Sequence, residues 1–267
     1  DMGVAGAALA TVISQLASCV YVLCVLFGKK VPVRIGFGGY SMRLIGRILL
    51  TGISPFLIIF VDSVMIISMN AVLQSYGGPE LGDRLITCAT IAQSFMLVVT
   101  MPLGGISGGT QTILAFNYGA HRRDRILQAE KHIALLCVGY TALMFALARL
   151  GGGLFVRLFT TEPELAAEAL DAIRICTLAV IPLGIQYAIV DGFTGMAQVK
   201  LALPLSAFRK VVYFAALFWL PAAFGARAVF YAEPVSDVLG PIASVIIYAV
   251  FIKKILDFPA ATRHHEG

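Results

Sequence analysis

Two aspartates lie inside long apolar stretches, and they are the residues best placed to do chemistry. Asp62 is near the middle of the stretch 48–76, and Asp191 is in the second half of the stretch 170–199. An ionised group at the centre of a bilayer costs at least about 2.5–3.5 kcal/mol, so such a residue usually has a function or a partner. A carboxyl group in a membrane cavity can exchange a proton for a cation. Both aspartates are therefore candidate ion sites, and the alternative is that each caps a broken helix or pairs with a basic residue.

Asp191 has polar company on its own predicted helix face. Tyr187 precedes it by four residues, and Thr194 and Gln198 follow it by three and seven. These spacings bring side chains to one face of a helix. The group is the predicted site for a substrate cation and for a coupling ion, with sodium near Asp191 as the alternative to a proton. No other metal is predicted.

Asp62 shares its predicted helix face with Thr51, Pro55, Met65 and Met69. Thioethers are soft and adaptable, which suits a cavity for varied apolar cations. Met65 is therefore a candidate substrate contact beside Asp62. Ordinary helix packing is the alternative interpretation of the methionines.

Other polar residues in the apolar stretches are assigned to structure. Small residues let membrane helices approach closely, and amides bond across the contact. We expect this packing role for a stripe on the third stretch, formed by Gln93, Thr100, Gly104, Gly108 and Gln111. Glu233 and Asp237 stand near the start of the last stretch, where a solvated helix start explains them.

The spans contain no set of nucleophile, base and acid. Serines are present, but no histidine lies near one within a span. Intramembrane hydrolysis needs such a constellation. The chain is therefore predicted not to be an enzyme and to need no cofactor.

The composition predicts that these residues are carried by membrane helices. Hydrophobic residues make up 59% of the chain and charged residues 13%, against about 45–50% and about 25% in soluble domains. A helix needs about 20 apolar residues to cross a bilayer. The predicted fold is an all-α integral membrane bundle with about seven transmembrane helices. Its apolar stretches are 3–27, 48–76, 85–117, 132–150, 170–199, 203–226 and 234–252.

Basic residues predict the orientation of these helices, because they resist translocation and mark cytoplasmic loops. Fifteen of the 20 basic residues fall in or after every second gap between the apolar stretches. This pattern puts Asp1 outside the cell and Gly267 in the cytoplasm. The predicted location is the plasma membrane, which in a bacterium is the inner membrane. The net charge of +5 is thus a topology signal and does not indicate nucleic-acid binding. The fifteen are Lys29, Lys30, Arg34, Arg43, Arg47, Arg122, Arg123, Arg125, Lys131, Lys200, Arg209, Lys210, Lys253, Lys254 and Arg263.

The long polar gap after the first stretch predicts the domain organisation. It predicts a separate first helix at 1–27, a cytoplasmic linker at 28–47, a six-helix unit at 48–256 and a cytoplasmic tail at 257–267. Part of the linker, residues 40–50, could instead be an interfacial amphipathic helix. Six helices behind a linker fit one half of a two-repeat transporter. Because the first helix starts outside, the chain is expected to be the C-terminal part of a longer protein, and a trimmed seven-helix protein is the alternative.

Several motifs resemble the multidrug and toxic compound extrusion (MATE) transporters. The segment 108–120 is similar to the end of that family's eighth helix, where a Gln-Pro pair precedes Asn-Tyr-Gly-Ala. Thr112 stands here in place of the proline, and Ala115 and Ala197 stand where glycine is common. The matching positions that we take as structural are Gln111, Asn117, Tyr118, Gly119, Ala120 and, later in the chain, Arg209 with Ser206. Weaker matches cover 2–15, 158–164, 174–175, 182–184 and 193–197.

The resemblance implies a two-lobed bundle of twelve helices, of which this chain holds the sixth helix and the C-terminal lobe. It implies export of organic cations or amphipathic drugs in exchange for protons or sodium ions. In one branch of the family, acids of the seventh and tenth helices contribute to the cation site, and Asp62 and Asp191 occupy those helices here. In another branch the critical aspartate is on the first helix. The implied partners are the drug, the ion, membrane lipid and the N-terminal lobe.

Three alternatives stay open. A related flippase for lipid-linked oligosaccharides would need a cationic cavity for phosphate, and the cores of the predicted spans hold no Lys or Arg to supply one. A seven-helix receptor or membrane enzyme fits the number of spans, but the linker and the lack of an extracellular disulfide do not favour it. The third alternative is an inert fragment.

Overall fold

The chain is almost entirely helical, as the composition predicted. The computed structural model describes residues 3–27 and 41–258, apart from the side chains of residues 51–59 and of a few others near the start of each range, and these two ranges contain no strand. Its elements are α1 (Gly3–Leu26), α2 (Met42–Gly119), α3 (Arg123–Leu150), α4 (Gly152–Val156), α5 (Pro163–Cys176), α6 (Val180–Gly195), α7 (Val199–Phe224), the 3₁₀ helix η1 (Ala226–Tyr231) and α8 (Ala232–Ile255).

The chain divides into two compact units, residues 1–60 and 61–267. In the first unit, α1 carries no charged residue and exposes Leu16, Val20 and Tyr21. Such a helix satisfies its own backbone hydrogen bonds and needs only lipid or apolar partners around it. The division into lobes, linker and tail stays a prediction, because residues 28–40 and 259–267 lie outside the described ranges. Residues 40–50 were the alternative interfacial helix, and from Met42 onward they form the start of α2.

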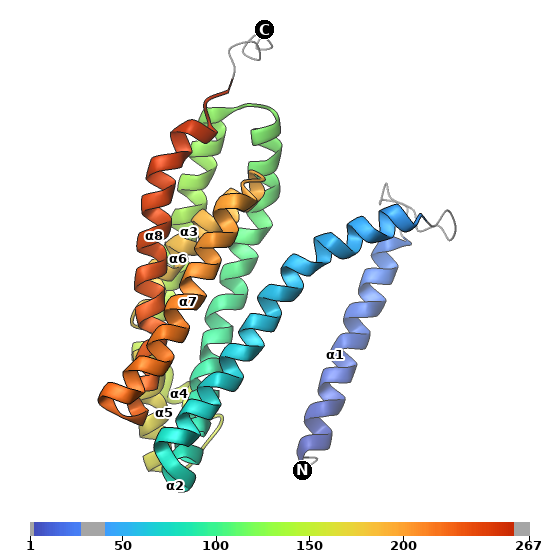
Figure 1. Cartoon of the computed structure of the whole chain (residues 1–267). Coiled ribbons are helices and arrows are strands. Elements are labelled where there is room, and N and C mark those ends of the chain that lie inside the picture. The colour runs from blue at the N-terminus through green and yellow to red at the C-terminus, as the bar shows by residue number, and fades with distance from the viewer. Residues whose placement is uncertain (1–2, 28–40, 259–267) are drawn as a thin grey trace. The chain divides into compact units, whose positions relative to one another are not determined.

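Helix α2 consists of two helical arms that meet at Gly78, where the chain turns back on itself (Figure 1). Gly78 has a φ of +68°, which residues with a Cβ rarely adopt. The arms also approach closely at this turn, since a Cβ added to Gly77 would lie 2.7 Å from the backbone nitrogen of Gly82. The glycines therefore join the predicted stretches 48–76 and 85–117 with almost no loop.

Replacing the turn glycine is expected to weaken the hairpin. Gly78→Ala should lower the free energy of unfolding by about 1–2 kcal/mol, because an L-residue is strained at positive φ. Gly105→Ala is the matched control, since Gly105 is an exposed helical position with no atom within 4 Å of an added Cβ. Thermal unfolding of the purified protein in detergent measures both. Equal unfolding midpoints for the two variants would contradict the strain argument.

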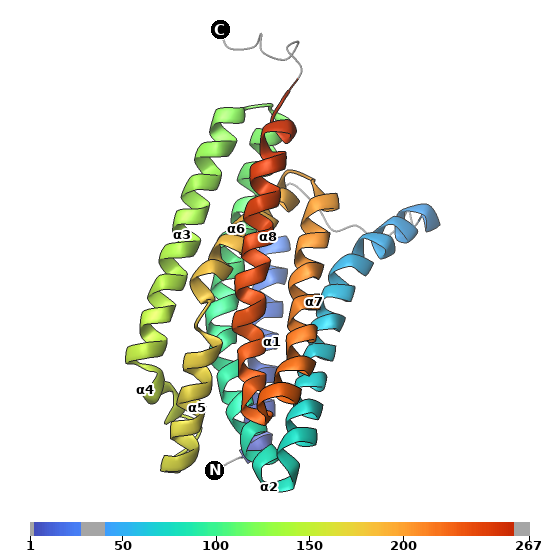
Figure 2. The same ribbon diagram turned by 60° about the vertical axis from the view of Figure 1, so that its left-hand side comes forward.

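The second unit is a bundle in which long helices lie side by side (Figures 1 and 2). Helix α3 packs along α6, α6 along α8, and α8 along α7. Its core is apolar and well filled, and the largest completely buried side chains include Leu73, Leu103, Phe193, Met196 and Leu217. The bundle thus holds the helices that carry Asp62 and Asp191 in fixed register.

The fifth predicted stretch is a broken helix. Helices α5 and α6 meet at an angle of 45° across a break of three residues. The break comes just before Pro182, where the sequence predicted a kink, and the side chain of Arg149 donates to the carbonyl oxygen of Arg174 at 2.9 Å. A break inside a membrane is tolerated when side chains satisfy the freed backbone groups in this way.

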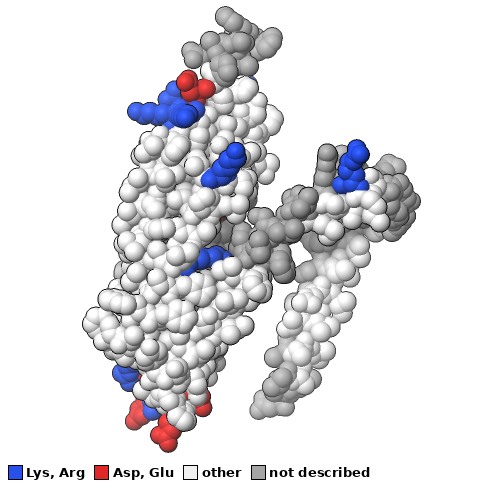
Figure 3. Space-filling model, viewed as in Figure 1, with Lys and Arg blue, Asp and Glu red and all other residues white. Residues whose placement is uncertain are grey.

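All seven predicted stretches fall on helices. Within residues 3–27 and 41–258, five helices are long and apolar enough to cross a membrane, and the bent α5–α6 pair makes a sixth. One of the five, residues 60–119, contains the turn at Gly78, so its two arms supply two of the predicted stretches. Figure 3 shows that charged side chains on one face of the second unit gather mainly at its two ends. The protein is therefore an integral membrane protein.

Candidate functional site

Asp191 is held by two side chains from the second arm of α2. The hydroxyl of Ser107 donates to its Oδ2, and the amide of Gln111 donates to its Oδ1 at 3.0 Å. The two helices come together because a glycine follows on α6, where a Cβ on Gly195 would lie 2.9 Å from the carbonyl oxygen of Gln111. Hydrogen bonds to an ionised acceptor are stronger than neutral ones. The arrangement therefore supports an ionised carboxylate that is half-buried among the helices.

The contacts that the structure gives for the other residues predicted to join Asp191 are with other groups. The ring of Tyr187 packs against Gly104, one helical turn before Ser107. Thr194 is exposed and donates to a backbone oxygen of its own helix. Gln198 donates to the hydroxyl of Tyr118 at 3.1 Å and so ties the end of α6 to the end of α2. Helical spacing placed these residues on one face, but the donors to Asp191 come from another helix.

Asp62 forms an ion pair with a lysine of α7. The ammonium of Lys210 lies 2.6 Å from Oδ1 of Asp62, and the side chains are 12% and 49% exposed. Met65 is half-buried and packs against the core. Side-chain contacts of Thr51 and Pro55, which share the predicted face of Asp62, lie outside the described residues.

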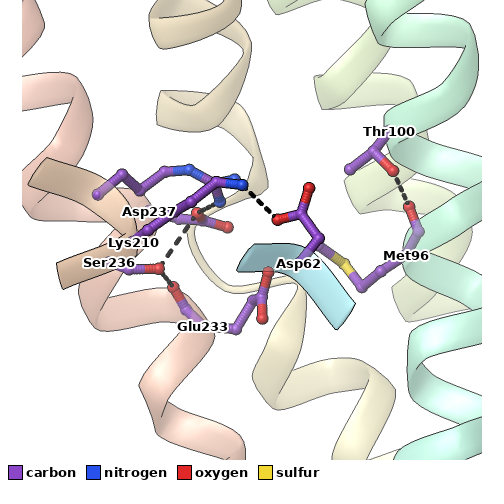
Figure 4. A network of polar contacts seen from close by, with 8 residues as sticks. Asp62, Met96, Thr100, Lys210, Glu233, Ser236 and Asp237 are labelled. Atoms are coloured by element: carbon purple, nitrogen blue, oxygen red, sulfur yellow. Dashed lines mark hydrogen bonds and ion pairs between the residues drawn. The ribbon is translucent and has the colours of Figure 1, made fainter. Parts of the chain in front are cut away.

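A second ion pair lies next to the first, between α7 and α8. Arg209 donates to Oδ1 of Asp237 at 2.9 Å, and Ser236 also lies within 3.5 Å of that oxygen (Figure 4). Asp237 is completely buried. The expectation of a solvated helix start is therefore wrong for Asp237, because η1 and α7 cover this part of α8. Glu233, one turn earlier, lies beside the same cluster (Figure 4).

The two basic residues stand at the middle of a helix. Arg209 and Lys210 are the eleventh and twelfth of the 26 residues of α7. Counting them with Lys200 as loop charges was therefore wrong, and that loop keeps only Lys200 as its positive signal. The argument that the span cores hold no Lys or Arg, which counted against a flippase, is also wrong. Both cations are matched by carboxylates, so the cluster is ionic but not strongly positive.

Glu130 of α3 is a buried acid that the sequence did not single out. One of its oxygens accepts from the hydroxyl of Tyr248 on α8, and the other is buried with no hydrogen-bond partner among the described residues. A Cβ on Gly192, next to Asp191, would lie 3.0 Å from that second oxygen. The predicted stretch began at residue 132, so Glu130 was taken as a loop residue. Glu130 could have been found if the helix had been predicted to begin before the apolar stretch, near residue 123.

Gln111 is the motif residue at the end of α2 that bonds to Asp191, and the other motif residues there have structural contacts. Asn117 bonds back to the carbonyl of Ile113, and Tyr118 packs on Phe258 as well as accepting from Gln198. Gly119 ends the helix, and Ala120 begins the turn to α3. These contacts fix the end of the bundle near the C-terminus of α8.

A separate cavity of about 620 Å³ lies among α5, the end of α7 and η1. Its walls are mostly apolar, and its acids include Glu168 and Asp171. Glu168 already pairs with Arg227 at 2.8 Å and with Arg84 at 3.6 Å. Glu168 therefore joins α5 to α2 and to η1.

The family of the chain follows from comparison with known proteins. The sequence model of the MatE family matches residues 58–219, which include Asp62, Asp191 and Arg209. The chain belongs to the MatE family. The resemblance read from the segment 108–120 is thereby confirmed. The match begins within the first arm of α2 and ends near the end of α7, so it includes Asp62, Lys210 and Asp191 but not α8.

Curated relatives of this MatE chain include the multidrug export protein MepA of Staphylococcus aureus. In strain MSSA476 it is 25% identical over 255 residues, which are 92% of this chain and 54% of MepA. In strain NCTC 8325 / PS 47 it is 24% identical over 257 residues, with the same shares covered. The chain thus spans about half the length of the curated relatives that it matches.

Solved structures confirm the MATE fold. A MATE crystallised in complex with MaL6 superposes with a TM-score of 0.81 at 19% identity, over 96% of this chain and 58% of that one. An inward-facing multidrug resistance MATE transporter of the MOP superfamily gives 0.79 at 19% identity, over 97% and 60%. A MOP superfamily transporter from Pyrococcus furiosus Vc1, described as having a binding pocket of reverse polarity, gives 0.79 at 18% identity, over 96% and 58%.

Proposed function

We propose that this MatE chain is the C-terminal part of a secondary antiporter that exports organic cations or amphipathic drugs in exchange for protons or sodium ions. The observation that carries the proposal is Asp191, a half-buried carboxylate in the middle of the bundle with Ser107 and Gln111 as its donors. The similarity to MepA, a multidrug export protein, supports the substrate class.

Coupling follows from competition at a carboxylate. When a proton or sodium ion neutralises Asp191, the drug cation loses its electrostatic attraction to the site. Each ligand can shift the outward and inward states only as far as its affinities for the two states differ. The ion and the drug therefore need to share the site, or to act through the same helix α6, for one to drive the other.

Efflux of a fluorescent cation tests the proposal. The protein encoded by the whole gene is reconstituted in liposomes that contain ethidium. The movement of ethidium across the membrane is then followed after a pH gradient or a sodium gradient is imposed. Movement driven by either gradient supports antiport and identifies the coupling ion. No movement under either gradient, with correctly folded protein, would contradict the proposal.

Flipping of lipid-linked oligosaccharides is the second candidate. Arg209 and Lys210 at the middle of α7 favour it, because such a lipid carries phosphate. Their pairing with Asp237 and Asp62 counts against it, since phosphate would need an unpaired cation. The same liposomes, loaded with a short-chain polyprenyl diphosphate sugar, compare the two activities directly. We expect drug efflux to be the one that responds to the ion gradient.

A further inference from the structure

The acid on α2 is already occupied by a cation of the protein itself. Lys210 and Asp62 are 148 positions apart in sequence, yet their charged atoms are 2.6 Å apart. The ammonium end belongs to a side chain that is only 12% exposed, whereas the aspartate is half-exposed in this chain. An external cation that approaches Asp62 therefore meets an acid whose charge is matched.

We propose that Lys210 is a tethered competitor that an organic cation or a coupling ion must displace in order to bind Asp62. The inference rests on the proposed function, since it assumes that Asp62 is a cation site. On this proposal, Lys210 determines how tightly Asp62 binds an external cation and which cations it binds.

The lysine stem is suited to such a role. A tethered group competes as though present at millimolar or higher concentration, because its partner is always within reach. A lysine ammonium is also a compact charge on a flexible four-carbon chain, so it can swing away without moving the helix. An arginine would hold the acid with a rigid two-pronged contact and would be harder to displace.

The surrounding charges offer the displaced lysine another place. The neighbouring Arg209 is engaged by Asp237, with Ser236 at the same oxygen. Glu233 extends from α8 into the same cluster, and Met96 points toward it from the second arm of α2 (Figure 4). Glu233 is thus a second acid beside the ion pairs, and we expect the displaced ammonium to move toward it while Asp62 binds a cation from outside.

Equilibrium binding of ethidium to the purified protein, encoded by the whole gene, tests the inference. Lys210→Met is expected to tighten the Kd by at least about tenfold, because Asp62 loses its internal competitor. Lys210→Arg should bind as the wild type does or more weakly. Lys200→Met is the matched control, since it removes an exposed lysine from the start of the same helix and should leave the Kd unchanged.

The double variant Lys210→Met/Asp62→Asn tests whether Asp62 is the acid that binds ethidium. We expect it to lose the tighter ethidium binding of Lys210→Met. An uncharged dye of similar size should bind equally well to all variants. Equal ethidium Kd values for Lys210→Met and Lys200→Met, or a gain that survives Asp62→Asn, would overturn the inference alone. Absence of ethidium binding in every folded variant, the wild type included, would overturn the proposed function and this inference with it. Lys210→Gln provides the same comparison where Lys210→Met fails to fold.

Discussion

Arg209→Met should unfold far more readily than the wild type, with a loss of about 3–5 kcal/mol in the free energy of unfolding. The substitution leaves Asp237 as an unpaired charge, and breaking one side of a buried ion pair has an effect of this size. Asp237 is completely buried, and one of its oxygens has no partner among the described residues even when Arg209 is present. The arginine is therefore the main group that makes burial of this carboxylate tolerable.

Unfolding of the purified protein in mixed micelles measures the effect, and two further variants assign it. Arg209→Met/Asp237→Leu should recover most of the loss, because a buried pair replaced by apolar groups is often nearly neutral. Arg174→Met removes a half-exposed arginine paired with Asp171 at 3.8 Å and should change stability by less than about 1 kcal/mol. A double variant as unstable as Arg209→Met would show that shape, not charge, sets the stability of this contact.

Asp191→Asn is expected to abolish ion-coupled efflux, bringing it down to the level of empty liposomes. The amide keeps the size of the side chain and one acceptor oxygen for Ser107 or Gln111, so the bundle should stay folded. It cannot carry the charge that a proton or sodium ion neutralises. Ethidium efflux under an imposed gradient, at equal protein content, measures the change.

Thr194→Ala is the control for position on the same helix. Thr194 is one turn from Asp191, but it is exposed and bonds only to Val190 among the contacts that the structure gives. Its substitution should leave efflux near the wild-type rate, although the sequence placed it beside Asp191. Wild-type efflux in Asp191→Asn would remove this aspartate from the mechanism and leave Asp62 as the remaining candidate on this chain.

The helices could be predicted because apolar length and turn glycines are local properties. Gly77 and Gly78 stand between two apolar stretches, and the chain folds back there with a positive φ at Gly78. Helix starts were less accurate, since α3 begins at Arg123 and not at residue 132. Charged residues in a first helical turn face water or headgroups and do not interrupt the helix, whereas a hydropathy pattern counts them as loop. The same error hid Glu130.

The site could be predicted only in part, because burial cost identifies single residues and not their partners. Asp191 stood out by itself, whereas Ser107 and Gln111 come from a helix about 80 positions earlier. Gln111 was noticed, but as a packing residue. Lys210 and Arg209 were read as loop charges, although ion pairing with Asp62 and Asp237 allows a charged residue at the middle of a membrane helix. Such pairing depends on which helices are neighbours, and one sequence does not give that.

The central charges of α7 also bear on how the protein enters the membrane. On the scale of translocon insertion, a basic residue at the centre of a helix disfavours transfer into lipid by about 2.5–3.5 kcal/mol, and α7 carries two. The partner of Lys210 has been synthesised long before, on α2, but the partner of Arg209 emerges 28 residues later, on α8. We therefore expect α7 to wait beside the translocon during synthesis and to be released into the bilayer together with α8, as a pair joined by Arg209 and Asp237.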